Sequence, residues 1–180
     1  AAIKELENVP QYQKKQEEYK LTYGKIISNM GSYYYQRKEY EEALKWHKKA
    51  LEFRKISLPD RVMDSYRTIM SDYFCMKQYE KGYETYREAV KKTQPDALFL
   101  VRAIGCELCL LKEKKEENLE KQILEELPVQ IERVVELAVS NRRMNVGVLK
   151  DLQKKLEELE AWTELQELVK EYRTKIEEYL

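Results

Sequence analysis

The chain has 180 residues, of which 43% are hydrophobic and 37% are charged, while glycine and proline together number only nine. Its 33 basic residues balance its 33 acidic ones, so the net charge of zero excludes general attraction to phosphate and leaves only short basic patches. Three cysteines are too few for a disulfide framework, which favours a reducing, cytoplasmic location, and no apolar run approaches the length of a membrane span.

Apolar residues recur at steps of three, four and seven along almost the whole chain, which is the helical period, and no segment has a strand pattern. Residues 3–8 look like the end of a helix, and Pro10 is placed to open the next one. The start at Ala1, inside this pattern, fits both a fragment lacking an upstream domain and a trimmed tag. The predicted helices after Pro10 are 11–37, 40–56, 60–76, 79–93, 96–113, 117–126, 128–141, 145–159 and 161–179.

The helix at 96–113 is apolar nearly all round, so it should lie between neighbouring helices. The last two helices are charged and amphipathic. Their apolar stripes, Leu149 to Leu159 and Leu165 to Ile176, should cap the end of the structure or, as an alternative, pair with a second copy of the chain.

Residues 31–51 and 70–90 superpose with a shift of 39 residues and no gap, which indicates stacked supersecondary units. Small residues recur in both copies: Gly31, Ala43 and Ala50 in the first, and Gly82 and Ala89 in the second. Small side chains let two helix axes approach closely.

This pattern resembles the tetratricopeptide repeat, in which a small residue of the first helix packs on alanines of the second. The resemblance implies an all-α, right-handed solenoid of antiparallel hairpins with about eight helices, forming one domain over residues 1–180. Clear repeats are expected at 24–56 and 63–93, and degenerate ones at 98–141 and 145–180. The chain departs from the family in three ways: its spacing exceeds the usual repeat of about 34 residues, His47 stands where a large aromatic residue is common, and the closing proline comes late, at Pro59.

In such a stack the first helix of each hairpin lines a concave groove. The repeat register predicts a lining of Lys25, Ser28, Ser32, Tyr35, Gln36, Asp64, Arg67, Ser71, Phe74, Phe99 and Arg102, with Cys75 and Cys106 beside them. Arg67 and Arg102 occupy equivalent positions and should stand near each other, where with Lys25 they would suit a carboxylate or an acidic peptide. The alternative is that these arginines merely pair with Asp64 and nearby glutamates.

No catalytic set is predicted, because the single histidine has no nucleophile beside it in the pattern and no glycine-rich phosphate loop occurs. Cys106 and Cys109 lie three apart on a helix and are interpreted as core thiols rather than a metal site, and no cofactor is expected.

The sequence therefore predicts a non-catalytic domain that binds a peptide or protein segment, without direct contact to nucleic acid or membrane, as a monomer or as a homodimer through its terminal helices. Two alternatives stay open. One is the sensing domain of a bacterial regulator whose DNA-binding helix-turn-helix lies upstream, and the other is an assembly scaffold that binds a folded partner.

Overall fold

The structure, a computed structural model, describes residues 10–113, 116–140 and 146–180. These residues form eight α-helices and two short 3-10 helices without any strand, which confirms the all-α prediction. The helix predicted at residues 3–8 lies outside the described residues. The chain divides into two compact units, Ala1–Met76 and Lys77–Leu180. This boundary falls inside the second predicted repeat, and the single-domain organisation stays a prediction.

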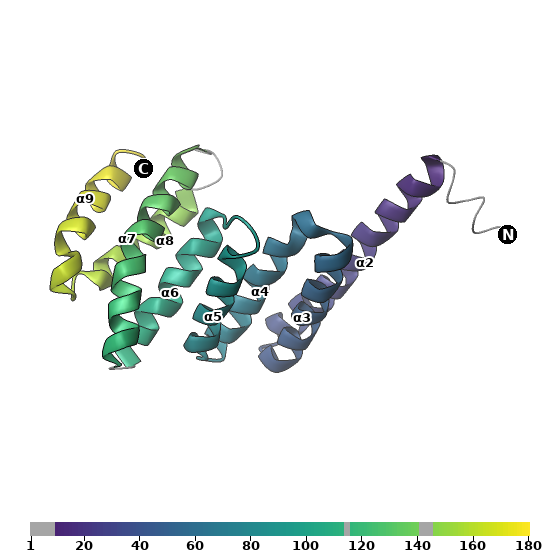
Figure 1. The fold of residues 1–180 in the computed structure, drawn as a ribbon, viewed down its shortest axis with the longest axis horizontal. Coiled ribbons are helices and arrows are strands. Elements are labelled where there is room, and N and C mark those ends of the chain that lie inside the picture. Colours follow the sequence, from purple (N-terminus) through teal and green to yellow (C-terminus); the bar gives the residue numbers. More distant parts are fainter. Residues whose placement is uncertain (1–9, 114–115, 141–145) are drawn as a thin grey trace. The chain divides into compact units, whose positions relative to one another are not determined.

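Unit 1 is built from α2 (Pro10–Gln36), α3 (Tyr40–Ser57), the 3-10 helix η1 (Pro59–Arg61) and α4 (Val62–Cys75). Helix α3 packs against both α2 and α4 (Figure 1). The predicted small residues lie where the helices approach: Gly31 is buried, and Ala43 and Ala50 are 0% and 1% exposed. Close approach of the axes is possible because no bulky side chain separates them.

The turn between α2 and α3 closes with a residue in the left-handed conformation, Lys38, whose φ is 64°. The amide of Lys38 donates to the carbonyl of Tyr35 at 2.9 Å, and that of Glu39 donates to Tyr34 at 3.0 Å, so the last carbonyls of α2 are satisfied. Lys77, 39 residues later, has φ 57°. The residues that follow, Glu39 and Gln78, also share their dihedrals, at −88°, 65° and −94°, 60°. The sequence period is thus repeated in the backbone.

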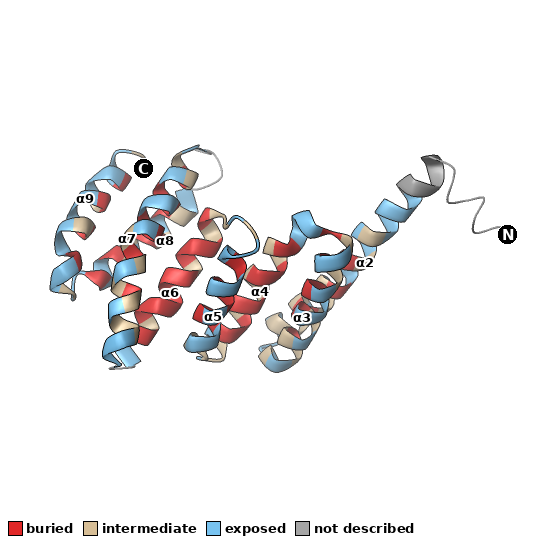
Figure 2. Cartoon of the chain, viewed as in Figure 1, coloured by how far each residue is buried: buried red, intermediate tan, exposed pale blue. Residues whose placement is uncertain are grey.

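Unit 2 contains α5 (Tyr79–Val90), α6 (Ala97–Glu113), α7 (Glu117–Ser140), α8 (Val146–Leu159), η2 (Thr163–Leu165) and α9 (Gln166–Glu177). Helix α6 packs against α5, α7 and α8 and is buried along almost its whole length (Figure 2). Its internal position is the one that its apolar sequence predicts.

The prediction of two helices separated at Pro128 is wrong, because α7 runs without a break from Glu117 to Ser140. Proline removes one backbone hydrogen bond and costs roughly 3 kcal/mol in a helix interior. The apolar stripe of α7 continues across it, since Ile123, Leu127, Ile131 and Val134 are all 0% exposed. Packing of this stripe on α6 outweighs the local cost of the proline.

The two stripes of the terminal helices are buried within unit 2 itself. Leu152, Leu156 and Leu159 of α8 are 0% exposed, and Val169 and Ile176 of α9 are at most 1% exposed. Helix α8 packs on α6, α7 and α9. These side chains therefore cover the end of the unit, as the capping interpretation expects.

Candidate functional site

One face of unit 1 carries nine of the predicted lining residues, and we call it the α2–α4 surface. All nine keep exposed area, whereas Ile27, Gly31, Tyr66 and Met70, which lie on other faces of α2 and α4, are buried. The two helices present their residues in the same register, 39 positions apart, because both follow the helical period. The α2–α4 surface consists of Lys25, Ser28, Ser32, Tyr35 and Gln36 of α2 and Asp64, Arg67, Ser71 and Phe74 of α4.

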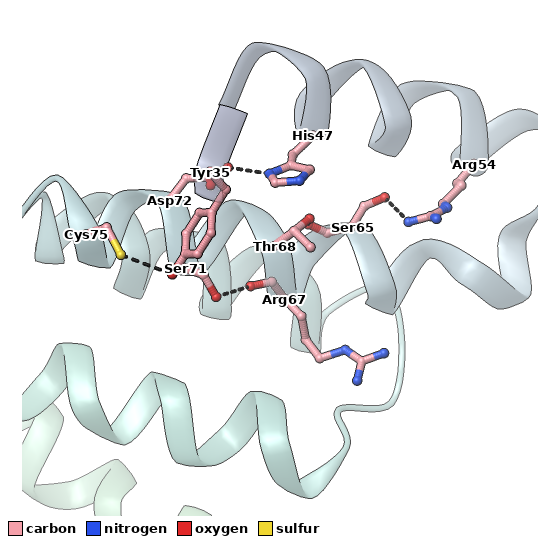
Figure 3. A network of polar contacts seen from close by, with 9 residues as sticks. All are labelled: Tyr35, His47, Arg54, Ser65, Arg67, Thr68, Ser71, Asp72 and Cys75. Atoms are coloured by element: carbon pink, nitrogen blue, oxygen red, sulfur yellow. Dashed lines mark hydrogen bonds and ion pairs between the residues drawn. The ribbon is translucent and has the colours of Figure 1, made fainter. Parts of the chain in front are cut away.

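A direct contact joins the two helices at this surface. The hydroxyl of Tyr35 lies 3.1 Å from Sγ of Cys75 (Figure 3), and the Tyr35 ring meets that of Tyr40 edge to face with centroids 5.4 Å apart. Burial raises the pKa of Tyr40, and the Cys75 thiol beside it adds to the rise. The structure thus brings the end of α2 and the end of α4 together within unit 1.

Arginine side chains gather at the start of α4. Arg67 forms an ion pair with Asp64, and Nη1 of Arg61 lies 3.8 Å from the same carboxylate. Burial lowers the pKa of Arg54; Asp64 opposes this change, while the charges of Arg61 and Arg67 reinforce it. The pairing of Arg67 with Asp64, which the sequence allowed as the alternative to ligand binding, is therefore present. Arg61 and Arg67 thus both lie near the Asp64 carboxylate at this end of the surface, and the buried Arg54 guanidinium interacts with the same charge.

A buried polar pair fixes α4 against α3 behind this surface. Nδ1 of His47 lies 2.6 Å from Oδ2 of Asp72, and the two side chains are 2% and 0% exposed (Figure 3). Burial raises the pKa of Asp72, and the hydrogen bond and charge of His47 oppose that rise. Two turns away along both helices, Nη1 of Arg54 donates to Oγ of Ser65 at 2.8 Å. Figure 3 shows Asp72 and Ser65 pointing towards α3 and Arg67 pointing away from it.

Gly31 is small because the His47 ring occupies the space where a side chain would begin. A Cβ at position 31 would lie 3.0 Å from Cε1 of His47 and closer still to Cδ2 and Nε2. His47, which stands where a large aromatic residue is common in the family, therefore packs directly on α2 and is hydrogen-bonded to Asp72 of α4. Through His47, the three helices of unit 1 are held together.

The predicted lining residues of unit 2 differ in exposure. Arg102 is partly exposed, but Phe99 is 0% exposed and its ring lies against Tyr86, with centroids 6.2 Å apart. Phe99 is thus a core side chain that offers no surface to a ligand. Arg67 belongs to unit 1 and Arg102 to unit 2, so their proximity stays a prediction.

The thiols of α6 behave as the core interpretation expects. Cys106 is 0% exposed, and burial raises its pKa to about 12, with the Glu107 carboxyl adding to the rise. Cys109 is partly buried, and its pKa is raised for the same reason. Within the described ranges, no group of three or more histidine, cysteine or acidic side chains is arranged to hold a metal ion.

Sequence reasoning missed Arg54, Arg61 and Asp72. A signal existed for Asp72, because it lies between the core residues Ile69, Met70 and Tyr73 on the buried face of α4. A carboxylate at such a position needs a buried partner. The identity of that partner, 25 residues away on α3, follows only from the packing of the helices.

The described helices and their antiparallel packing define an all-α helical-repeat protein. A family model of the tetratricopeptide repeat matches residues 25–61, so this part of the chain is a tetratricopeptide repeat. The matched residues include the last turns of α2, the whole of α3 and the Gly31–His47 contact. No curated protein sequence matches the chain.

The tetratricopeptide repeat is generally a protein-binding module, and the match supports that general role for residues 25–61. Every helix along the described part of the chain is too short or too polar to cross a bilayer.

Proposed function

We propose that the α2–α4 surface binds an extended segment of a partner protein, with an acidic group of that segment held near Arg61 and Arg67. The observation that carries this proposal is the contact between Tyr35 and Cys75, which sets the two lining helices side by side. The chain would act by recognition alone.

Two features of the surface define the segment that fits it. At one end, Arg61 and Arg67 both lie near the carboxylate of Asp64, and the exposed Lys25 of α2 adds a further positive charge. A carboxylate suits this end, because guanidinium groups bind carboxylates in a bidentate geometry. At the other end, Tyr35 is partly exposed and Phe74 is 40% exposed, so both rings can contact an apolar side chain.

Selection of binders from a random peptide library, followed by reversal of charge in the protein, tests the proposal. Selected peptides should carry an acidic residue several positions from an apolar one. Arg67→Glu should weaken their binding at least tenfold, because it turns attraction into repulsion at a partly buried position. Phe74→Ala should weaken binding without altering the preference for acidic peptides.

Lys45→Glu is the matched control, since Lys45 is an exposed residue of α3 in the same unit and makes the same change of charge. Equal losses for Arg67→Glu and Lys45→Glu would show a general charge effect and reject this surface. Replacement of both Arg67 and Arg102 by alanine should abolish binding with helicity intact if the partner also contacts α6.

A further inference from the structure

Unit 2 contains a cavity of about 340 Å³ on a different set of helices. Tyr86 of α5, Leu100 of α6 and Val129 of α7 form its apolar wall. Val129 is 67% exposed although it is a large aliphatic residue next to Pro128, so the apolar wall continues to the molecular surface. None of these residues belongs to the α2–α4 surface.

The polar groups at this cavity are mainly hydrogen-bond acceptors. The carboxylates of Glu125 and Glu126 and the amide of Gln130 line it. Glu126 accepts hydrogen bonds from Tyr83 at 2.9 Å and from Gln122 at 3.1 Å, whereas Glu125 makes no hydrogen bond or ion pair with the described residues. Gln130 is 3% exposed, and its Nε2 donates to Glu107 at 2.6 Å while its Oε1 has no partner within the described chain.

The surroundings of the cavity are electronegative. Burial raises the pKa of both Tyr83 and Tyr86, and the acidic side chains beside them raise both further, whereas Arg87 lowers both. The one cationic side chain among the cavity's lining residues, Arg133, has its guanidinium 2.9 Å from Glu136 on the same helix. The carboxylates of Glu125 and Glu126 therefore outnumber the one cationic lining residue, whose guanidinium is already paired with Glu136, so a further positive group complements this site.

We propose that the cavity between α5, α6 and α7 binds an arginine side chain of a partner polypeptide. The aliphatic stem of the arginine lies against Leu100, Val129 and the Tyr86 ring, and its guanidinium donates to Glu125 and Glu126. A volume near 340 Å³ is at the lower end of the range of about 300–1,000 Å³ for ligand pockets. It suits one long side chain, and the planar fork of five donors suits a site with several acceptors and few donors.

The proposal is tested by titrating the intact chain with N-acetyl-arginine-N-methylamide and following its backbone amides by nuclear magnetic resonance. N-acetyl-citrulline-N-methylamide is the control ligand, because it keeps the shape and most of the donors but lacks the charge. The arginine compound should bind saturably, with shifts centred on residues 125–130 and on Leu100. The citrulline compound should bind about tenfold more weakly, as expected for the loss of a charge-assisted hydrogen bond.

Two variants localise the binding. Glu125→Gln removes one carboxylate at an exposed position and should weaken binding of the arginine compound at least threefold. Glu132→Gln makes the same change at an exposed position of α7 outside the cavity and should leave binding unchanged. Equal binding of the two compounds, shifts centred on the α2–α4 surface, or the absence of saturable shifts would each overturn the proposal.

Discussion

The two units bury their polar side chains in different ways. In unit 1, four buried polar residues form two side-chain pairs across α3 and α4, His47 with Asp72 and Arg54 with Ser65. In unit 2, α6 is surrounded by apolar contacts, and its buried Glu107 is hydrogen-bonded to Gln130. Buried polar pairs are costly when one partner is removed, whereas an apolar interface tolerates change more evenly. Unit 1 has two such pairs and unit 2 has one, so the stability of unit 1 should depend more on specific polar partners and that of unit 2 more on apolar volume.

The largest effect is expected from breaking the pair between His47 and Asp72. His47→Phe supplies the aromatic ring common at this position but leaves Asp72 buried without its partner, so it should destabilise unit 1 by about 3 kcal/mol. The double variant His47→Phe, Asp72→Leu makes the interface apolar and should regain all but about 1 kcal/mol. Hydrogen exchange of the α3 and α4 amides measures the change in unit 1.

This double-variant cycle also has an informative opposite outcome. If the single and double variants were equally unstable, the ring at position 47 would matter for its shape and not for its bond to Asp72. The two units would then differ less than their contacts suggest.

Glu107 gives unit 2 a dependence on pH. Burial raises its pKa from 4.5 to about 8, while the hydrogen bond from Gln130 opposes the rise. Between pH 5 and pH 8 the folded state holds a proton that the unfolded state has released, so stability falls as the pH rises. The expected loss is up to about 4 kcal/mol over these three pH units, from about 1.36 kcal/mol for each pH unit.

Hydrogen exchange of α6 amides at pH values from 5 to 8, corrected for the intrinsic exchange rates, measures this loss. Glu107→Gln removes the titrating group, so its stability should be nearly level where that of the parent chain declines. Glu132→Gln is the control, because an exposed glutamate should leave the slope as it is. A parent chain whose α6 protection does not change over this range would contradict the buried, protonated state of Glu107.

The sequence predicts local features well, because they follow from residues close together in the chain. Helix positions, the small residues Gly31, Ala43 and Ala50, and the equivalence of Lys38 and Lys77 all follow from periods of 3.6 and 39 residues. The left-handed conformation of Lys38 and Lys77 is not expected from lysine itself, because a positive φ is disfavoured for residues other than glycine. Its recurrence in both copies shows that the helices on either side impose it.

The polar pairs could not be predicted in the same way, because each joins residues 11 to 25 positions apart on different helices. Periodicity assigns a residue to a face but does not say which side chain it meets there. A partial signal exists in Glu107, an acidic residue inside the otherwise apolar α6, where any side chain is expected to be buried. For the candidate site, the register selects the residues of the α2–α4 surface, whose role in binding stays a prediction, while the positions of Arg54 and Arg61 follow only from packing.

The smallest expected change in stability comes from replacing a helical glycine by alanine, and it should differ between Gly31 in unit 1 and Gly147 in unit 2. Gly31→Ala places a methyl group against the His47 ring, which is held by Asp72 and cannot move freely, so it should cost about 1–3 kcal/mol despite the better helix propensity of alanine. Gly147→Ala meets no atom within 4 Å in α8 and should be neutral or stabilising by up to about 1 kcal/mol. Thermal unfolding followed by circular dichroism compares the two variants with the parent chain. If Gly31→Ala were as harmless as Gly147→Ala, the His47 ring would be able to shift, and the rigid polar interface that distinguishes unit 1 from unit 2 would lose its main support.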